Sequence, residues 1–183
     1  GRSYINHPME LNIWRAPTDN DMYIKLEWKK AHYDAAYTRA YRIEVLQNKH
    51  GVLIMEHVAV VADTVQKILD VKMTWKINED GKIEAVIEAI KDKEFPDLPR
   101  FGLRMFLNKK MDEITYFGMG PQESYCDKHQ AASHGLYRAD VGDLHEDYIR
   151  PQENGSHYNC QYASVGNLYA KGKKPFSFQA SRY

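Results

Sequence analysis

Two glutamates in the last third of the chain, Glu123 and Glu153, lie in polar loops that contain glycines, where catalytic groups are often found. Paired carboxylates can cleave a glycosidic bond. They must lie about 5.5 Å apart in retaining enzymes and roughly 6.5–9.5 Å apart in inverting ones, a distance that sequence spacing cannot test. A glutamate in a Gly-Pro-Gln-Glu turn more often accepts hydrogen bonds that fix its loop, and we favour this structural interpretation.

The stretch 11–21 combines an indole, a guanidinium, a proline and an Asp-Asn-Asp run. In a structural interpretation the proline sets a turn, a polar side chain caps the following helix, and Trp14 is buried. Arg15 then pairs with Asp19 or Asp21. In a binding interpretation the stretch contacts a sugar, because tryptophan stacks on the apolar face of a pyranose and polar side chains bind its hydroxyls. The candidate sugar-contact residues are Trp14, Arg15, Asp19, Asn20 and Asp21.

A second candidate group lies in the segment 118–175, which is rich in Gly, His, Asp, Asn and Tyr. Loop regions this long are uncommon unless they are functional or are supported by other domains. The loop candidates for sugar contact are Glu123, Tyr125, Glu153 and Asn154, together with Tyr148 and Tyr158. The alternative is that these loops pack on neighbouring domains or subunits and bind no ligand.

The eight histidines do not have the spacing of a metal site. His129 and His134 are separated by five positions, whereas two ligands on one helical face are separated by four. His145 stands beside acidic residues that a strand would place on different faces. We therefore expect no metal site. A weakly held Mg²⁺ or Ca²⁺ on Asp19 and Asp21 has only the carboxylate type in its favour.

The composition excludes several classes of partner. Basic and acidic residues number 25 each, so the net charge is zero and neither nucleic-acid nor membrane binding is predicted. A length of 183 residues predicts a single domain, 1–183. Cys126 and Cys160 form neither a disulfide framework nor a Cys-x-x-Cys metal motif, and free thiols are expected.

Alternating apolar and polar residues predict antiparallel β structure. Residues 67–78 give the clearest strand, and a turn ending at Gly81 joins it to a strand over 82–89. Further strands are expected over 37–45, 52–61, 101–107 and 176–183. The segment 118–175 is expected to hold few strands. One short helix is expected near residues 21–31, and its apolar face is predicted to carry Ile24, Trp28 and Ala31.

Four stretches, in this order, carry a resemblance to a known family. They are Trp14-Arg15-Ala16-Pro17-Thr18-Asp19-Asn20-Asp21, Gly118-Met119-Gly120-Pro121-Gln122-Glu123-Ser124-Tyr125, Pro151-Gln152-Glu153-Asn154-Gly155 and Phe176-Ser177-Phe178-Gln179-Ala180-Ser181-Arg182-Tyr183. The sequence resembles the C-terminal domain (domain 5, the small chain) of the glycoside hydrolase family 2 β-galactosidases. The matches cover nearly the whole chain.

The resemblance implies an all-β fold, an antiparallel supersandwich of the galactose-mutarotase type in which two large sheets stack on each other. The family's domain continues for several strands after its match to residues 181–183, so this chain is expected to be truncated at its C-terminal end. A tryptophan that the family places against the sugar belongs to that later segment and has no match here. We therefore expect at most weak sugar binding by this chain alone.

The resemblance also implies a function. The parent enzyme is expected to hydrolyse terminal non-reducing β-D-galactose residues, as in lactose, with retention of configuration. The family's catalytic glutamates belong to an upstream TIM-barrel domain. We therefore expect no catalytic residue in this chain and no activity of the chain alone, and a role in shaping the active-site rim and in oligomer packing.

The same resemblance implies the setting of the chain. The expected partners are the upstream TIM-barrel and sandwich domains, the galactoside, and further copies in a homo-oligomer. No cofactor is expected in this chain, because Mg²⁺ or a monovalent cation would act through the other domains. The expected compartment of the parent is the cytoplasm.

Two alternatives stay open. As a weak galactoside-binding module, the chain would bind sugar through Trp14 and its neighbours, and Trp14→Ala would abolish binding. As a mutarotase-like aldose epimerase, it would need a histidine and a carboxylate paired in one cleft, and the sequence alone identifies no such pair.

Overall fold

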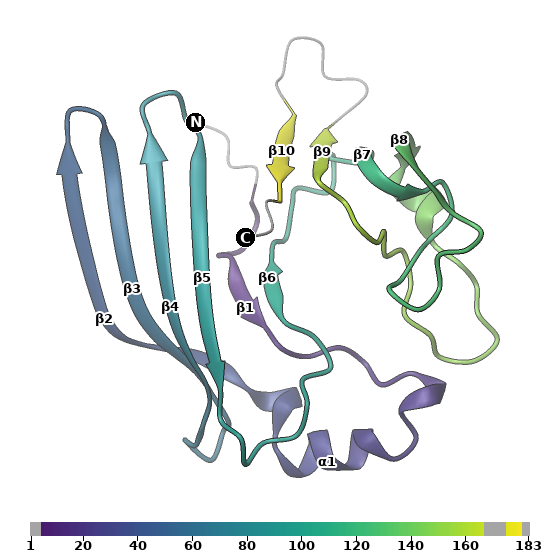
Figure 1. The fold of residues 1–183 in the computed structure, drawn as a ribbon, viewed down its shortest axis with the longest axis horizontal. Helices are drawn as coiled ribbons and strands as arrows, with labels where there is room; N and C mark the ends of the chain where they lie inside the picture. Colours follow the sequence, from purple (N-terminus) through teal and green to yellow (C-terminus); the bar gives the residue numbers. More distant parts are fainter. Residues whose placement is uncertain (1–4, 167–174, 181–183) are drawn as a thin grey trace. The chain divides into compact units, whose positions relative to one another are not determined.

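The computed structural model of the protein describes residues 5–166 and 175–180 (Figure 1). The chain forms two compact units, one of Met9–Arg104 and the other of Gly1–Pro8 with Met105–Tyr183. Antiparallel sheets predominate in both units, which confirms the predicted all-β class. The stacking of two large sheets and the single domain over 1–183 stay predictions.

The larger sheet of the unit Met9–Arg104 is an antiparallel meander of four strands. Its strands are β2 (Tyr37–Asn48), β3 (Gly51–Val61), β4 (Lys67–Asn78) and β5 (Ile83–Lys91), and each pairs with the next. The strand predicted over 67–78 is confirmed as β4. Gly81, at φ 82°, closes the predicted turn by donating its N–H to the Asn78 carbonyl at 3.0 Å. Glycine takes this positive φ without steric strain.

The core of this unit lies where a helix and a small sheet cover one half of the apolar face of the meander. The helix, α1 (Ile24–Lys30), confirms the helix predicted near 21–31, and the small sheet pairs β1 (Glu10–Asn12) with β6 (Gly102–Arg104). The core residues are Leu11, Ile13, Trp28, Tyr33, Val58, Val60, Ala62, Ile68, Leu69, Val71 and Met73. Trp28 is 4% exposed and Ile24 is 36% exposed, so the apolar face of α1 is narrower than predicted.

Two aromatic side chains tie the double-proline loop 95–99 to this core. Trp28 Nε1 donates to the Asp97 carbonyl at 2.9 Å. Tyr33, in the 3₁₀ turn η2 (Tyr33–Ala35), donates its hydroxyl to the Pro96 carbonyl at 2.6 Å. Burial, with Asp97 nearby, raises the pKa of Tyr33 to about 12, so its hydroxyl stays protonated as a donor.

The other unit contains a four-stranded antiparallel sheet in the order β10-β9-β7-β8. Its strands are β7 (Glu113–Gly120), β8 (Ser133–Asp140), β9 (Tyr162–Gly166) and β10 (Phe176–Gln179). β8 lies in a segment where sequence predicted few strands, and it pairs with β7 along its whole length. Partner contacts therefore decide its structure more than its weak local pattern does. β10 begins where a strand was predicted, and the last predicted residues, 181–183, lie outside the described residues.

Candidate functional site

The two predicted groups of site residues lie in different units of the fold. The stretch 14–21 belongs to the unit Met9–Arg104, and the loop residues from Glu123 onward belong to the other unit. Each group is therefore described by itself. Contact of either group with a sugar stays a prediction.

Asp21 organises the first group. Its carboxylate accepts the Thr18 backbone N–H at 2.7 Å and the Thr18 hydroxyl at 3.0 Å. It also forms a two-pronged ion pair with Arg15, in which Nη2 and Oδ1 are 3.1 Å apart and Nη1 contacts Oδ2. Thr18 is the N-cap residue of the 3₁₀ turn η1 (Asp19–Asp21), so the predicted turn is confirmed, and Asp21 is the partner of Arg15. The predicted cap of the following helix is wrong, because α1 begins after Tyr23, which forms no side-chain cap hydrogen bond.

The charges around Asp21 keep it ionised. Burial alone would raise its pKa, but hydrogen bonds from Arg15 and Thr18 and the charge of Arg15 outweigh burial and lower the pKa. Both carboxylate oxygens already accept these donors. A Mg²⁺ or Ca²⁺ site on Asp19 and Asp21 therefore does not fit this geometry.

Acidification is expected to remove the stability that Asp21 provides. A carboxyl whose pKa is lowered by folding stabilises the protein above its unfolded pKa of about 3.9 and loses this contribution as the pH falls through its folded pKa. The difference in unfolding free energy between wild type and Asp21→Asn, measured by urea titration, should therefore shrink between about pH 7 and about pH 3. A difference that grows on acidification would contradict this assignment.

Asn20 is the most exposed member of this group, and Trp14, Arg15 and Asp19 are half-buried. Trp14 is half-buried and packs edge-on against Trp28, with ring centroids 6.3 Å apart. The Arg15 guanidinium lies over the Trp28 ring, 5.2 Å from its centroid. Asp19 is half-buried and Asn20 is exposed. Arg15, in contrast, is committed to the fold through its ion pair and its ring contact.

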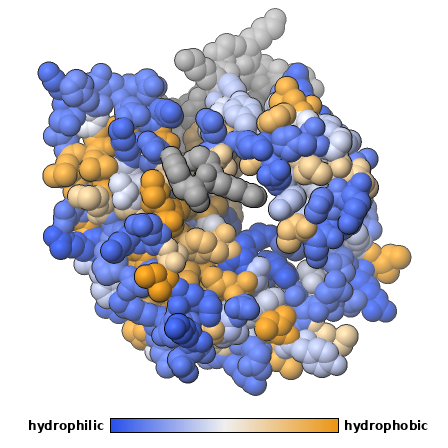
Figure 2. Space-filling model, in the orientation of Figure 1, coloured by the Kyte–Doolittle hydropathy of each residue, from blue (hydrophilic) through white to orange (hydrophobic). Residues whose placement is uncertain are grey.

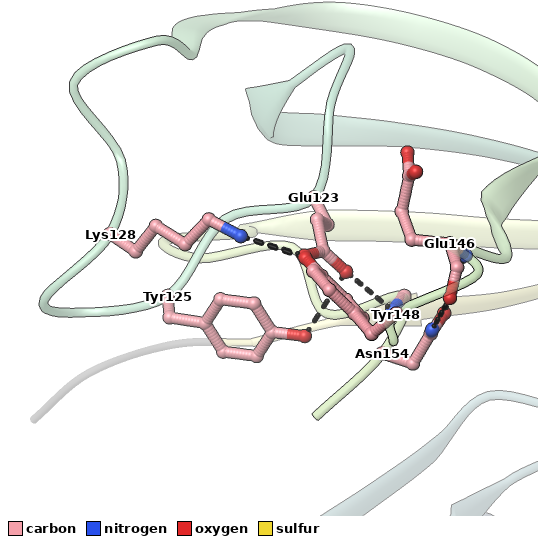
Figure 3. A network of polar contacts seen from close by, with 7 residues as sticks. Glu123, Tyr125, Lys128, Glu146, Tyr148 and Asn154 are labelled. Atoms are coloured by element: carbon pink, nitrogen blue, oxygen red, sulfur yellow. Dashed lines mark hydrogen bonds and ion pairs between the residues drawn. The ribbon is translucent and has the colours of Figure 1, made fainter. Parts of the chain in front are cut away.

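Glu123 holds the loop group together (Figure 3). Its side chain is 6% exposed. One carboxylate oxygen accepts from Lys128 Nζ at 3.0 Å and from the Tyr148 hydroxyl. The other accepts the Tyr125 hydroxyl at 3.3 Å and the Gly155 N–H at 3.1 Å. We call these five residues the Glu123 cluster. The cluster joins three loop segments, as the structural interpretation of this glutamate predicted.

The electrostatics of the Glu123 cluster favour a fixed carboxylate. Burial, and then the charge of Glu123, raise the pKa of Tyr125 to about 12, so this phenol stays a donor at neutral pH. Lys128 also donates to the Tyr148 hydroxyl at 2.8 Å and lies over the Tyr148 ring at 5.2 Å. With two donors on each oxygen, the Glu123 carboxylate links the loops that carry these donors.

Ser124 is a second residue that fixes these loops. It is fully buried and its N–H donates to the Ser156 carbonyl at 2.8 Å. Its hydroxyl donates to the Met119 carbonyl at 3.0 Å and accepts the Tyr158 N–H at 2.9 Å. These three bonds tie the end of β7 to the segment after Gly155.

Histidines next to carboxylates bear on the epimerase alternative. His57 Nε2 lies 2.5 Å from Asp70 Oδ1, and the His57 hydrogen bond is the main cause that lowers the pKa of Asp70. Both side chains are about two-fifths exposed, on an open sheet face. His157 is more enclosed, stacks on Tyr116 at 4.1 Å, and has its pKa lowered by burial. The pairs His32–Asp63 and His145–Asp147 are likewise formed by exposed side chains. An epimerase would need such a pair enclosed in a cleft, and these three pairs lie at the surface.

The other loop candidates form local contacts. Asn154 accepts the Glu146 N–H at 3.0 Å and donates to the Glu146 carbonyl at 2.5 Å. Tyr158 stacks on His129, with centroids 5.2 Å apart. Glu153 is half-buried, whereas Tyr148 is 38% exposed. Asn154 and Tyr148 are thus the exposed members of the loop candidates.

Sequence reasoning missed three residues that position these groups. Lys128 had a usable signal, a cation five positions after Glu123 in a loop with aromatic residues. Trp28 was assigned to the core but not to contact with Arg15. Ser124 had no signal, because a buried serine looks like any other loop serine until its partners are known.

Within the part of the chain that the structure describes, no three His, Cys, Asp or Glu side chains are grouped as a metal site would require. Cys126 and Cys160 are free, as expected. Among the described residues, no helix has both the length and the apolar character needed to cross a membrane.

The whole sequence is similar to known proteins. A family model described as the beta galactosidase small chain matches residues 1–183. A protein named beta-galactosidase from Actinobacillus pleuropneumoniae is 46% identical over 183 residues, which are 100% of this chain and 18% of that protein. A beta-galactosidase from Staphylococcus xylosus is 34% identical over 94% of this chain and 18% of that protein. The chain thus spans less than a fifth of the length of these relatives.

Proposed function

The chain belongs to the family of the β-galactosidase small chain, and from that premise we propose that it is the non-catalytic C-terminal part of a β-galactosidase. The parent enzyme would hydrolyse terminal non-reducing β-D-galactose residues with retention. The relatives named beta-galactosidase are more than five times as long as the matched segment, which leaves room for separate catalytic domains.

The state of Glu123 is the observation that carries this proposal. A retaining glycosidase needs one carboxylate that attacks the anomeric carbon and another, about 5–5.5 Å away, that carries a proton to the leaving oxygen. Glu123 is enclosed and accepts four hydrogen bonds from its own loops. Asp21 is enclosed in the same way by Arg15 and Thr18. Carboxylates held like this stabilise the protein, which supports the assignment of acid and nucleophile to other domains.

The role proposed for this chain is to shape the rim of the active site and to support oligomer packing. The loops fixed by the Glu123 cluster carry exposed side chains that could face a galactoside or another domain, among them Tyr148 and Ile149. The ordering of these loops before binding would lower the entropy lost when they contact a partner. Trp14 and Asn20 offer a second surface of this kind in the other unit.

The proposal is tested with the longer protein that carries this chain. Purified protein is assayed on chromogenic β-galactosides, α-galactosides and β-glucosides, and the first anomer released is identified by proton NMR. We expect selective cleavage of β-galactosides with β-galactose formed first, because double displacement retains configuration. Absence of β-galactoside turnover in folded protein, or release of α-galactose first, would refute the proposal.

A further inference from the structure

The loop that follows Glu153 contains an asparagine directly before a glycine, Asn154–Gly155. No other Asn-Gly pair occurs in the 183-residue sequence. At such a pair the backbone nitrogen of the glycine can attack the side-chain amide carbon of the asparagine, because glycine carries no side chain that obstructs the approach. The pair is therefore the place in this chain where the backbone reacts most readily with a neighbouring side chain.

The reaction open to this pair is deamidation, a covalent change of the chain. The Gly155 nitrogen loses its proton and bonds to Cγ of Asn154, the Cγ–Nδ2 bond breaks, and the amide nitrogen leaves as ammonia with that proton. Water then adds to a carbonyl of the resulting succinimide ring and opens it to aspartate or isoaspartate. An amide and water thus become a carboxylic acid and ammonia, without oxidation or reduction. Water is at hand, because hydrophilic side chains predominate on the surface over β7, β8 and the loops beside them (Figure 2, on the right).

The fold requires the glycine that makes this pair reactive. Gly155 has a φ of 69°, in the left-handed region that side chains other than that of glycine seldom adopt. A Cβ at this position would also lie 3.2 Å from the Leu144 carbonyl oxygen. A larger residue, which would hinder the attack by its bulk, is therefore poorly tolerated here. Any protection of the pair must come from the groups to which it is hydrogen-bonded.

The amide of Asn154 is held at both of its ends by the backbone of one residue (Figure 3). Oδ1 accepts the Glu146 N–H at 3.0 Å, and Nδ2 donates to the Glu146 carbonyl at 2.5 Å. The side-chain amide and this backbone thus form a closed ring of hydrogen bonds. Deamidation draws Cγ from non-bonded contact to covalent distance from the Gly155 nitrogen. That displacement pulls the amide out of the ring, and the lost hydrogen bonds add to the barrier.

The attacking nitrogen is held as well. The Gly155 N–H donates to the Glu123 carboxylate at 3.1 Å. A carboxylate is far too weak a base to remove the proton of a backbone amide. Its negative charge instead opposes the anion that forms on the nitrogen before attack, and its oxygen occupies the side from which hydroxide would approach the N–H. Glu123 therefore slows the reaction at the nucleophile, while Glu146 restrains the carbon under attack.

We propose that Asn154–Gly155 is a latent deamidation site, which the Glu123 carboxylate and the Glu146 backbone keep unreacted while the loops are closed. The rate of deamidation then follows the frequency with which these loops open locally. The product has no side-chain N–H for the Glu146 carbonyl and adds a negative charge beside it, so one such event leaves the loop less firmly held. Deamidation at this site is thus an irreversible ageing step of the loop region. This inference goes beyond the proposed function and does not depend on it.

The rate of deamidation at residue 154 in the longer protein tests the role of Glu123. The protein is incubated in mildly alkaline buffer, and peptide mass spectrometry with electron-transfer fragmentation measures aspartate and isoaspartate at this position. Folded wild type is expected to react at least about tenfold more slowly than the same protein in urea, because reaction requires local opening. Glu123→Ala should react at least about fivefold faster than wild type, the effect of about one hydrogen bond. Lys128→Ala removes a cluster member that contacts neither reacting residue, and should change the rate less than about twofold.

Two substitutions at one position test the role of the Glu146 backbone. Glu146→Pro removes the N–H that Asn154 accepts, whereas Glu146→Ala keeps both backbone partners. His145 is already extended, with φ −90° and ψ 131°, as a residue before proline should be. Glu146→Pro is expected to raise the rate at least about fivefold and Glu146→Ala less than about twofold.

Three results would each overturn the inference. They are a folded wild-type rate equal to or above the rate in urea, a folded Glu123→Ala protein that reacts no faster than wild type, and equal rates for Glu146→Pro and Glu146→Ala. Should Glu123→Ala fail to fold, the wild-type comparison with urea and the two Glu146 variants still decide. None of these readouts uses catalysis, so failure of the proposed enzymatic role would leave this test intact.

Discussion

Trp28→Ala is expected to lower the free energy of unfolding by about 3–5 kcal/mol, the range for removal of a large buried aromatic side chain. Trp28 is 4% exposed and sits in the core between α1 and the strand meander. Its loss would also leave the Asp97 carbonyl without the indole donor, and would remove the ring against which Trp14 and Arg15 pack. The turn 14–21 should therefore loosen together with the core.

Urea unfolding followed by circular dichroism measures this effect, and two variants calibrate it. Leu26→Ala, on the same helix at a residue that is 54% exposed, should change stability by less than about 0.5 kcal/mol. Trp28→Phe keeps an aromatic ring and loses the indole N–H. Its decrease in the free energy of unfolding should therefore lie between those of Leu26→Ala and Trp28→Ala. A Trp28→Ala loss as small as that of Leu26→Ala would show that Trp28 is not the core anchor of this unit.

Glu123→Ala is expected to destabilise the loop region by about 2–3 kcal/mol, because buried donors lose a charged acceptor. The Tyr125 hydroxyl and the Gly155 N–H are part-buried and would be left without this partner. Lys128 is 60% exposed and would return to water at little free-energy cost. The loss should be local, since Ser124 still anchors the neighbouring backbone.

The hydrogen-exchange rate of a single amide, the Gly155 N–H, tests this prediction. The Gly155 N–H should exchange at least about tenfold faster in Glu123→Ala, which corresponds to 1.4 kcal/mol of lost protection. Lys128→Ala is the matched control, because it removes the exposed partner from the same cluster. Its global effect should stay within about 0–1 kcal/mol. Equal effects of the two variants would mean that the surface ion pair, and not the enclosed carboxylate, holds the loops.

The regular part of the fold could be predicted because its signals are local. β4 alternates without interruption, and Gly81 supplies the positive φ that its turn requires, so strand and hairpin follow from adjacent residues. β8 has no such signal, and its structure depends on pairing with β7. The residues that decide the structure of β8 belong to another segment, β7, so the local sequence pattern of β8 cannot reveal that it is a strand.

The contacts of the candidate site also divide into local ones, which sequence could predict, and long-range ones, which it could not. Arg15 and Asp21 are six positions apart across a proline turn, and their pairing was among the predicted ones. The hydrogen bond from Tyr148 to Glu123 spans 25 positions, and that from Trp28 to Asp97 spans 69. The paths of the intervening loops determine both contacts, and loop paths follow no residue period. The residue types therefore predicted the local pairing of Arg15 with Asp21, but the long-range partners required the structure.

The turnover number of the longer enzyme after Glu123→Gln and Glu153→Gln tests most directly whether the catalytic carboxylates lie outside residues 1–183. Glutamine keeps the size of the side chain and removes its acid, base and nucleophile chemistry. We expect kcat on a chromogenic β-galactoside to stay within about tenfold of wild type, because loss of a general acid or base alone typically lowers rates by about 10²–10⁴-fold. A fall of kcat by about 10²-fold or more in either variant, with the folded fraction unchanged, would place a catalytic carboxylate in this chain and contradict the proposed role.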